Sequence, residues 1–184
     1  TGGVAALERV LYDLHADGPP VVIVQHMPGA FLVSFAQMLN RRLEQDIAIA
    51  REREPLSRGQ IRLAPALGAH THICKDAGIW HCRFSENSTN ALHCPSVDML
   101  FHSAKAYGSD VIAVILTGLG RDGADGLHAL RCAGAQTLGQ DAETSVVYGM
   151  PRAAWEKGAV QQQLPLDRIG DAINKAVTQH ANRP

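Results

Sequence analysis

A histidine and an aspartate each follow a short apolar run that is typical of a buried β-strand. His26 lies in Gln25-His26-Met27-Pro28, directly after the apolar residues 21–24, and Asp122 lies in "TGLGRDGADG", directly after residues 111–116. In an open parallel sheet, functional sites form beyond the carboxyl ends of the strands. The two side chains would supply a general base and the carboxylate that orients it, and they lack only a nucleophile.

Each of these two residues also has a purely structural interpretation. A lone histidine is more often held by backbone groups than catalytic, although its place in a loop at this edge of the sheet favours a function. Asp122 stands just before a predicted helix, where a capping aspartate contributes about 1 kcal/mol of stability. The candidate site therefore depends on the pair rather than on either residue alone.

The opening turn Thr1-Gly2-Gly3 is the third segment that we expect at this edge. Small glycine-rich turns of this kind join the end of a strand to the start of a helix, and a helical pattern begins directly after Gly3. The turn should therefore lie near the loops that carry His26 and Asp122.

The pattern of strands and helices predicts an α/β fold with a doubly wound, mostly parallel sheet flanked by helices. We predict strands at 21–25, 47–50, 111–116 and 136–139, and a first helix that ends near residues 17–18. Further helices are predicted around 31–39, from Ser96 as N-cap to about 104, at 124–132, from Pro151, and from Asp167 as the cap of the last helix. Residues 61–84 do not continue this alternation of strands and helices. Asp76-Ala77-Gly78 separates two β-rich runs there, and this pattern predicts an antiparallel hairpin attached to the sheet.

Composition narrows the class of protein. The 184 residues are 46% hydrophobic and 19% charged, which is typical of one soluble globular domain. The formal net charge of -1 gives no electrostatic reason to expect binding to nucleic acid or an anionic membrane, and no apolar run is long enough to insert into a bilayer. Four cysteines without C-x-x-C spacing favour a reducing, cytoplasmic location.

Two other kinds of site fit parts of the pattern. Residues 118–123 match G-x-G-x-x-G, with Asp141 at about the distance of a ribose-binding acid, but Asp122 and Asp125 would place negative charge beside a pyrophosphate. A metal hypothesis rests on a His/Cys-rich segment that consists of His70, His72, Cys74, His81, Cys82, His93 and Cys94. The first three of these share one face of a predicted strand. No recognised ligand spacing repeats there, so we predict neither a metal nor a cofactor.

Five stretches in order resemble one known family over essentially the whole chain. They are "TGG", "VVIVQHMPGAF", "CPSVDMLFHSA", "VIAVILTGLGRDGADGL" and "VVYGMPRAAWEKG", and they are similar to the catalytic domain of the chemotaxis protein-glutamate methylesterases. The resemblance implies a Ser-His-Asp triad, in which His26 belongs to the Q-H-M-P motif and Asp122 to the G-x-G-x-D-G loop. The family's serine belongs to an S-T-G-G turn, which puts it immediately before Thr1.

The resemblance also implies an activity and partners. The family hydrolyses γ-glutamyl methyl esters on the cytoplasmic helical bundle of bacterial chemoreceptors, and related enzymes deamidate receptor glutamines through the same acyl-enzyme. Backbone N–H groups of the loop at residues 117–120, with Leu119 the best candidate and Gly118 and Gly120 beside it, are expected to stabilise the oxyanion, and Thr1 adjoins the nucleophile. We expect residues 1–184 to be the catalytic domain, with its first strand and its serine preceding Thr1, and residues 1–184 alone to be inactive. Family members usually carry an N-terminal receiver domain, so the chain is either excised from a protein of that kind or a homologue built without one.

The sequence departs from the family at two positions of the site and leaves two alternatives open. Cys94 stands where the family typically has arginine, and Leu119 where it usually has methionine. If no serine precedes Thr1, the alternative is a non-catalytic homologue that binds receptors. A further alternative uses Thr1 itself as an N-terminal nucleophile with its own α-amine as base.

Overall fold

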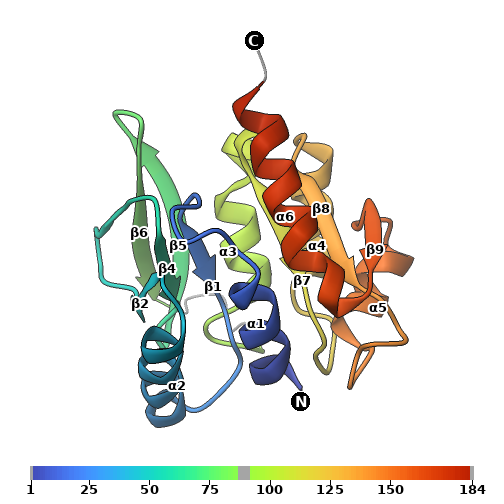
Figure 1. The fold of residues 1–184 in the computed structure, drawn as a ribbon, viewed down its shortest axis with the longest axis horizontal. Helices are drawn as coiled ribbons and strands as arrows, with labels where there is room; N and C mark the ends of the chain where they lie inside the picture. Colours follow the sequence, from blue (N-terminus) through green and yellow to red (C-terminus); the bar gives the residue numbers. More distant parts are fainter. Residues whose placement is uncertain (1, 87–91, 183–184) are drawn as a thin grey trace.

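A computed structural model describes residues 2–86 and 92–182. Figure 1 shows strands with helices packed around them and, at one side, a long two-stranded hairpin. In chain order the elements are α1 (Gly3–Tyr12), β1 (Val21–Ile23), α2 (Gly29–Arg42), β2 (Asp46–Ile49), β3 (Pro55–Leu56), β4 (Gln60–Leu63), β5 (Ala69–Asp76), β6 (Ile79–Glu86), α3 (Val97–Ser103), a 3-10 helix (Lys105–Asp110), β7 (Ile112–Ile115), α4 (Ala124–Cys132), β8 (Gln136–Gln140), α5 (Met150–Glu156), β9 (Gln162–Leu164) and α6 (Leu166–Ala181). The predicted α/β class is confirmed.

The first parallel set has the order β1–β4–β2. Val21 of β1 and Ile47 of β2 are both opposite Ile61 of β4, so β4 is the central strand. The prediction that placed Ile61 at the start of the antiparallel hairpin region was wrong, because Gln60–Leu63 runs parallel between two other strands.

Arg62 explains why this central strand was missed. An arginine in the run Gln60–Leu63 makes the sequence look half-exposed, yet the Arg62 side chain is only 5% exposed. Its guanidinium donates to the carboxylates of Asp46 and Glu54, both at 2.7 Å, and to the Asp46 carbonyl at 2.7 Å. A buried charge is tolerated where it is paired and hydrogen-bonded in this way, and no local pattern in the sequence reveals those partners.

The second parallel set has the order β7–β8–β9. Ile112 is opposite Gln136, and Leu138 is opposite Gln162. Among the described residues β1 pairs only with β4, and β7 pairs only with β8, so each of these two strands has one unpaired edge. These are the two strands that lead to His26 and to Asp122.

The predicted hairpin is confirmed and belongs to a small antiparallel sheet of order β3–β6–β5. Asp76 is opposite Ile79, and the turn between them holds Ala77 and Gly78 at positive φ, +49° and +83°. Helix α3 packs against β5 on one side and α4 on the other, which connects the hairpin to the loop that carries Asp122.

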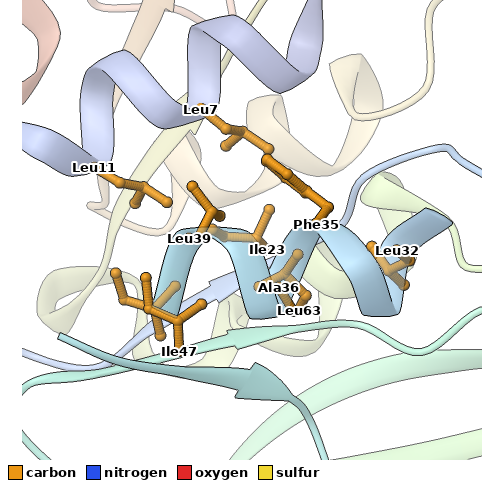
Figure 2. Close-up of a cluster of buried hydrophobic side chains, with 10 residues drawn as sticks. Leu7, Leu11, Ile23, Leu32, Phe35, Ala36, Leu39, Ile47 and Leu63 are labelled. Carbon is orange, nitrogen blue, oxygen red and sulfur yellow. The ribbon is translucent and has the colours of Figure 1, made fainter. Parts of the chain in front are cut away.

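Buried apolar side chains hold helices against the first parallel set (Figure 2). Leucines of α1 and the apolar face of α2 meet the strands in one cluster: Leu7, Leu11, Ile23, Leu32, Phe35, Ala36, Leu39, Ile47, Ile61 and Leu63. A second cluster of smaller residues, many of them alanines, joins β7 to α4 and α5. Burial at roughly 25 cal/mol per Å² of apolar surface makes these clusters the main source of stability.

Several predicted boundaries shift. Helix α1 ends at Tyr12 rather than near residue 17, and β1 ends at Ile23, where its carbonyl accepts the N–H of Ala64 at 2.8 Å. Asp167 was predicted as the cap of the last helix, but the N-cap is Pro165 and Asp167 lies in the first turn. The short strands β3 and β9 were not predicted. None of the described helices is both long enough and apolar enough to cross a membrane.

Candidate active site

His26 lies in the tight connection between β1 and α2. The backbone carbonyl of Pro28, the N-cap, accepts the N–H groups of Phe31 and Leu32 at 3.0 Å and so starts the helix. This short connection holds His26 at the carboxyl end of β1. The side chain is 28% exposed, so it is partly accessible from solvent.

Asp122 lies in the loop between β7 and α4, and the structure brings it to His26. Its Oδ2 is 2.9 Å from Nε2 of His26, although 96 residues separate the two in sequence. The carboxylate is 7% exposed. Gly123, the next residue, has φ +94°, and a Cβ there would lie 2.6 Å from Cγ1 of Val97. Only glycine fits this turn without strain.

Four donors surround the carboxylate of Asp122. Oδ2 accepts from His26 and from the N–H of Val97 at 2.8 Å, while Oδ1 accepts from the Ser96 hydroxyl at 2.8 Å and the N–H of Asp98 at 3.0 Å. Burial of Asp122 raises its pKa, but these hydrogen bonds outweigh burial and bring the pKa well below its ordinary value. The carboxylate therefore stays ionised across the physiological range.

The contact with Asp122 fixes the proton on the ring of His26. An ionised carboxylate only accepts, so Nε2 of His26 carries a hydrogen, and in the neutral ring the lone pair is then on Nδ1. The ring also stacks on His93, with 4.6 Å between the ring centroids and 25° between the planes. Nδ1 is thus the atom of this pair that is free to take a proton from a nucleophile.

The glycines of the opening turn lie against both of these loops. A Cβ on Gly3 would be 2.8 Å from Oε1 of Gln25, the neighbour of His26. A Cβ on Gly2 would be 2.7 Å from the side chain of Val146 and 3.4 Å from Cγ2 of Thr117. The three segments predicted to share one edge of the sheet therefore meet there. Thr1 itself lies outside the described residues.

The loop after β7 presents backbone donors next to Asp122. The N–H of Gly118 is used, because it donates to the Val147 carbonyl at 3.1 Å. Within residues 2–86 and 92–182, the N–H groups of Leu119 and Gly120 donate no hydrogen bond. The Leu119 side chain is exposed to solvent. The N–H of Thr117 is used as well, because it donates to Oε1 of Gln140 at 2.8 Å. Of the four N–H groups in the predicted oxyanion loop at residues 117–120, those of Leu119 and Gly120 are therefore available.

Sequence reasoning missed two residues beside the pair. Ser96 was predicted only as a helix cap, and it does accept the N–H of Met99 at 3.3 Å, but its hydroxyl also donates to Asp122. His93 was considered only within a metal hypothesis. His93 lies three residues before Ser96, in the segment that contacts Asp122. This closeness to Ser96 was the signal in the sequence that could have placed His93 near the site.

The metal alternative gains no support from the geometry. No three His, Cys, Asp or Glu side chains in the described part of the chain lie close enough together to hold a metal ion. Nε2 of His72 pairs with the Ser85 hydroxyl at 2.6 Å, and Nδ1 of His70 accepts a backbone N–H. Burial raises the pKa of the Cys82 thiol to about 12, so this thiol is not an ionised ligand at neutral pH.

Comparisons with known proteins agree on one family. The family described as CheB methylesterase matches residues 1–173. Proteins named protein-glutamate methylesterase/protein-glutamine glutaminase are similar: one from Agrobacterium fabrum is 49% identical over 97% of this chain, and one from Caulobacter vibrioides 45% identical over 94%. These alignments cover 51% and 50% of those two proteins, so the chain spans about half the length of the relatives that it matches. The crystal structure of the Thermotoga maritima CheB methylesterase catalytic domain superposes with a TM-score of 0.90 at 31% identity, covering 96% of this chain and 94% of the other.

Proposed function

Because this chain belongs to the CheB methylesterase family, we propose that residues 1–184 are the catalytic part of a protein-glutamate methylesterase. The observation that carries the proposal is the 2.9 Å contact between His26 Nε2 and Asp122 Oδ2, beside the opening glycine turn. The substrate is a γ-glutamyl methyl ester on the cytoplasmic part of a chemoreceptor.

The nucleophile in this proposal is a serine immediately before Thr1. Its Oγ attacks the ester carbonyl carbon while Nδ1 of His26 takes the hydroxyl proton. The tetrahedral intermediate collapses, the bond to the methoxy oxygen breaks, and His26 returns the proton to the departing methanol. Nδ1 then takes a proton from water, which attacks the carbonyl carbon of the acyl-enzyme. The bond to the serine Oγ breaks, His26 gives that proton to the Oγ, and the free glutamate side chain and the serine are released.

Asp122 acts through His26. It holds the ring with Nδ1 toward the nucleophile and stabilises the imidazolium that forms when Nδ1 is protonated. The low pKa of Asp122 supports this role, because a carboxylate that stays ionised keeps a full negative charge beside the ring. The partially exposed face of His26 gives the substrate access.

The N–H groups of Leu119 and Gly120 stabilise the oxyanion of the tetrahedral intermediate. Both lie in the loop that carries Asp122, and neither donates to another described residue. A main-chain donor does not depend on the side chain, so leucine in place of the family's usual methionine is compatible with this role.

A strand before Thr1 completes the sheet in this proposal. Among the described residues β1 and β7 each have one unpaired edge, and the glycine turn contacts the loops after both strands. A buried unpaired strand edge is unfavourable, since its N–H and C=O groups lack partners. A strand that ends at the serine would pair with both edges, as in the strand–turn–helix arrangement predicted for this segment.

Two further properties follow from the relatives. The names of these relatives include protein-glutamine glutaminase. An amide can form the same acyl-enzyme with ammonia in place of methanol as the leaving group, so we propose glutamine deamidation as a second activity. The length of the relatives, about twice that of this chain, leaves room for the N-terminal receiver domain that regulates members of the family. The four free cysteines are consistent with a cytoplasmic location.

The proposal is tested with the intact protein that contains residues 1–184. Wild-type protein should release methanol from methylated receptor membranes, and His26→Ala should release none above background. Receptor binding without methanol release would instead support the non-catalytic homologue. Loss of turnover on replacing Thr1, in a protein whose chain starts there, would support the N-terminal threonine mechanism. A residue other than serine before Thr1 would contradict the serine mechanism.

A further inference from the structure

A buried histidine outside the pair is connected to Asp122 through one residue. His70 is the second residue of β5, in the antiparallel hairpin, and it is 1% exposed. Its Nδ1 accepts the backbone N–H of Ser96 at 3.2 Å. The Ser96 hydroxyl in turn donates to Oδ1 of Asp122 at 2.8 Å. Hydrogen bonds thus lead from the hairpin to the carboxylate that contacts His26.

The positions of the hydrogens in this chain follow from the partners. The Ser96 hydroxyl gives its one hydrogen to the Asp122 carboxylate, while its oxygen accepts the N–H of Met99. Because a backbone N–H can only donate, Nδ1 of His70 must carry a lone pair. The Ser96 backbone N–H and hydroxyl are both engaged, so the arrangement holds Ser96, and with it Asp122, in one orientation.

Ser96 also controls how the next residues meet Asp122. The N–H groups of Val97 and Asp98 donate to the two oxygens of the same carboxylate, at 2.8 and 3.0 Å. Three of the four donors to Asp122 therefore come from the consecutive residues 96–98. His70 holds the first of these residues by accepting the backbone N–H of Ser96. Displacing Ser96 would change the position of all three.

We propose that His70 and Ser96 are positioning residues for the methylesterase reaction, which fix the carboxylate of Asp122 relative to His26. This inference rests on the proposed function. The antiparallel hairpin lies outside the parallel sheets, and this inference gives it a role in the active site. Its strand β5 supplies His70, which accepts the N–H of Ser96 and so holds the residues that donate to Asp122. Neither residue contacts the ester; both act through Asp122.

The test compares three variants of the intact protein in methanol release. His70→Leu removes the acceptor for the Ser96 N–H, and we expect kcat to fall about 10- to 100-fold with KM within about twofold, because a buried donor loses its partner. His70→Asn keeps an acceptor oxygen near the position of Nδ1 and should restore most of kcat. Thr71→Val is the matched control, because Thr71 is the adjacent, fully buried residue and its hydroxyl has no partner among the described residues. Its kcat should equal that of the wild type.

A second readout does not depend on turnover. The hydrogen on Nε2 of His26, bonded to Asp122, should give a low-field proton NMR signal that is present in the wild type, Thr71→Val and His70→Asn and shifted or broadened in His70→Leu. If His70→Leu does not fold, Ser96→Gly replaces it, because glycine is nearly as good an N-cap as serine but lacks the hydroxyl.

The outcomes separate the two proposals. Wild-type protein that releases no methanol would contradict the proposed function, and the NMR signal would still decide the role of His70. An active wild type with unchanged kcat and an unchanged signal in His70→Leu and Ser96→Gly would overturn the inference. Equal losses in His70→Leu and His70→Asn would also overturn it, since an acceptor would then not be what matters.

Discussion

Asp122 caps a helix that precedes it by 25 residues: its Oδ2 accepts the backbone N–H of Val97, the first residue of α3, at 2.8 Å. The local pattern had indicated the helix after Asp122 instead, but α4 has Gly123 as N-cap and no side-chain cap. The same oxygen accepts from His26, so one carboxylate connects His26 to the start of α3. The position of His26 therefore depends on how closely α3 and α4 pack.

The first prediction concerns that close packing. Gly123→Ala should destabilise the protein by more than the roughly 1–2 kcal/mol that a positive φ costs a non-glycine residue, because the new Cβ would also lie 2.6 Å from Val97. Gly120→Ala is the control: it has φ +93° but no atom within 4 Å of a Cβ. Urea unfolding measures both. Equal losses of stability would show that contact with Val97 is unimportant.

The second prediction tests the backbone donors. Leu119→Pro removes one N–H, and loss of an oxyanion donor should lower kcat about 10²- to 10³-fold. Leu119→Ala retains the N–H and removes only an exposed side chain, so its kcat should stay near the wild-type value. Circular dichroism checks that both variants are folded. A large loss in Leu119→Ala together with a small one in Leu119→Pro would assign the effect to the side chain instead.

The third prediction is a dependence of stability on pH. Since the pKa of Asp122 is lower in the folded than in the unfolded protein, its ionised contacts contribute fully above the ordinary pKa of an aspartate and are lost as the pH falls through the lowered value. The difference in free energy of unfolding between wild type and Asp122→Asn should therefore be constant from about pH 7 to 5 and shrink below about pH 4. A difference that grows on acidification would contradict this.

The fourth prediction concerns the ion pairs that Arg62, in the central strand β4, makes with Asp46 and Glu54. Burial lowers the pKa of Arg62, but hydrogen bonds to Asp46 and Glu54 outweigh burial and raise it. Arg62→Met should lower the free energy of unfolding by about 2–3 kcal/mol, below the value typical of breaking a fully buried pair, because Asp46 is largely exposed. In the control Arg58→Met, the exposed pair with Asp17 at 4.0 Å should be worth less than about 1 kcal/mol. Similar losses in the two variants would show that burial of Arg62 does not matter.

Most of the fold was predictable because its signals are local. Uniformly apolar, β-branched runs indicated the strands before His26 and Asp122, and helical spacing with end signals indicated α2, α4 and α5. What failed depends on distant partners. Arg62 looks incompatible with a central strand until Asp46 and Glu54 are placed around it, and β3 and β9 are too short to show any period.

The site was predictable to the same extent. The sequence places His26 and Asp122 at the ends of two strands, and parallel strands put those ends at one edge. Sequence alone did not reveal which ring nitrogen faces Asp122, that His93 stacks on His26, or that Ser96 and His70 lie behind the carboxylate. These contacts join segments 26 to 96 residues apart, and each residue has an ordinary local interpretation.

In the proposed mechanism Asp122 orients His26 as the base of an esterase, and kcat for methanol release in Asp122→Asn tests this role. An amide in place of the carboxylate lets the ring take the wrong tautomer, so we expect kcat to fall about 10³- to 10⁴-fold, with receptor binding retained and the variant folded at the assay temperature. A folded Asp122→Asn protein that releases methanol at the wild-type rate would show that Asp122 does not orient His26 for the reaction.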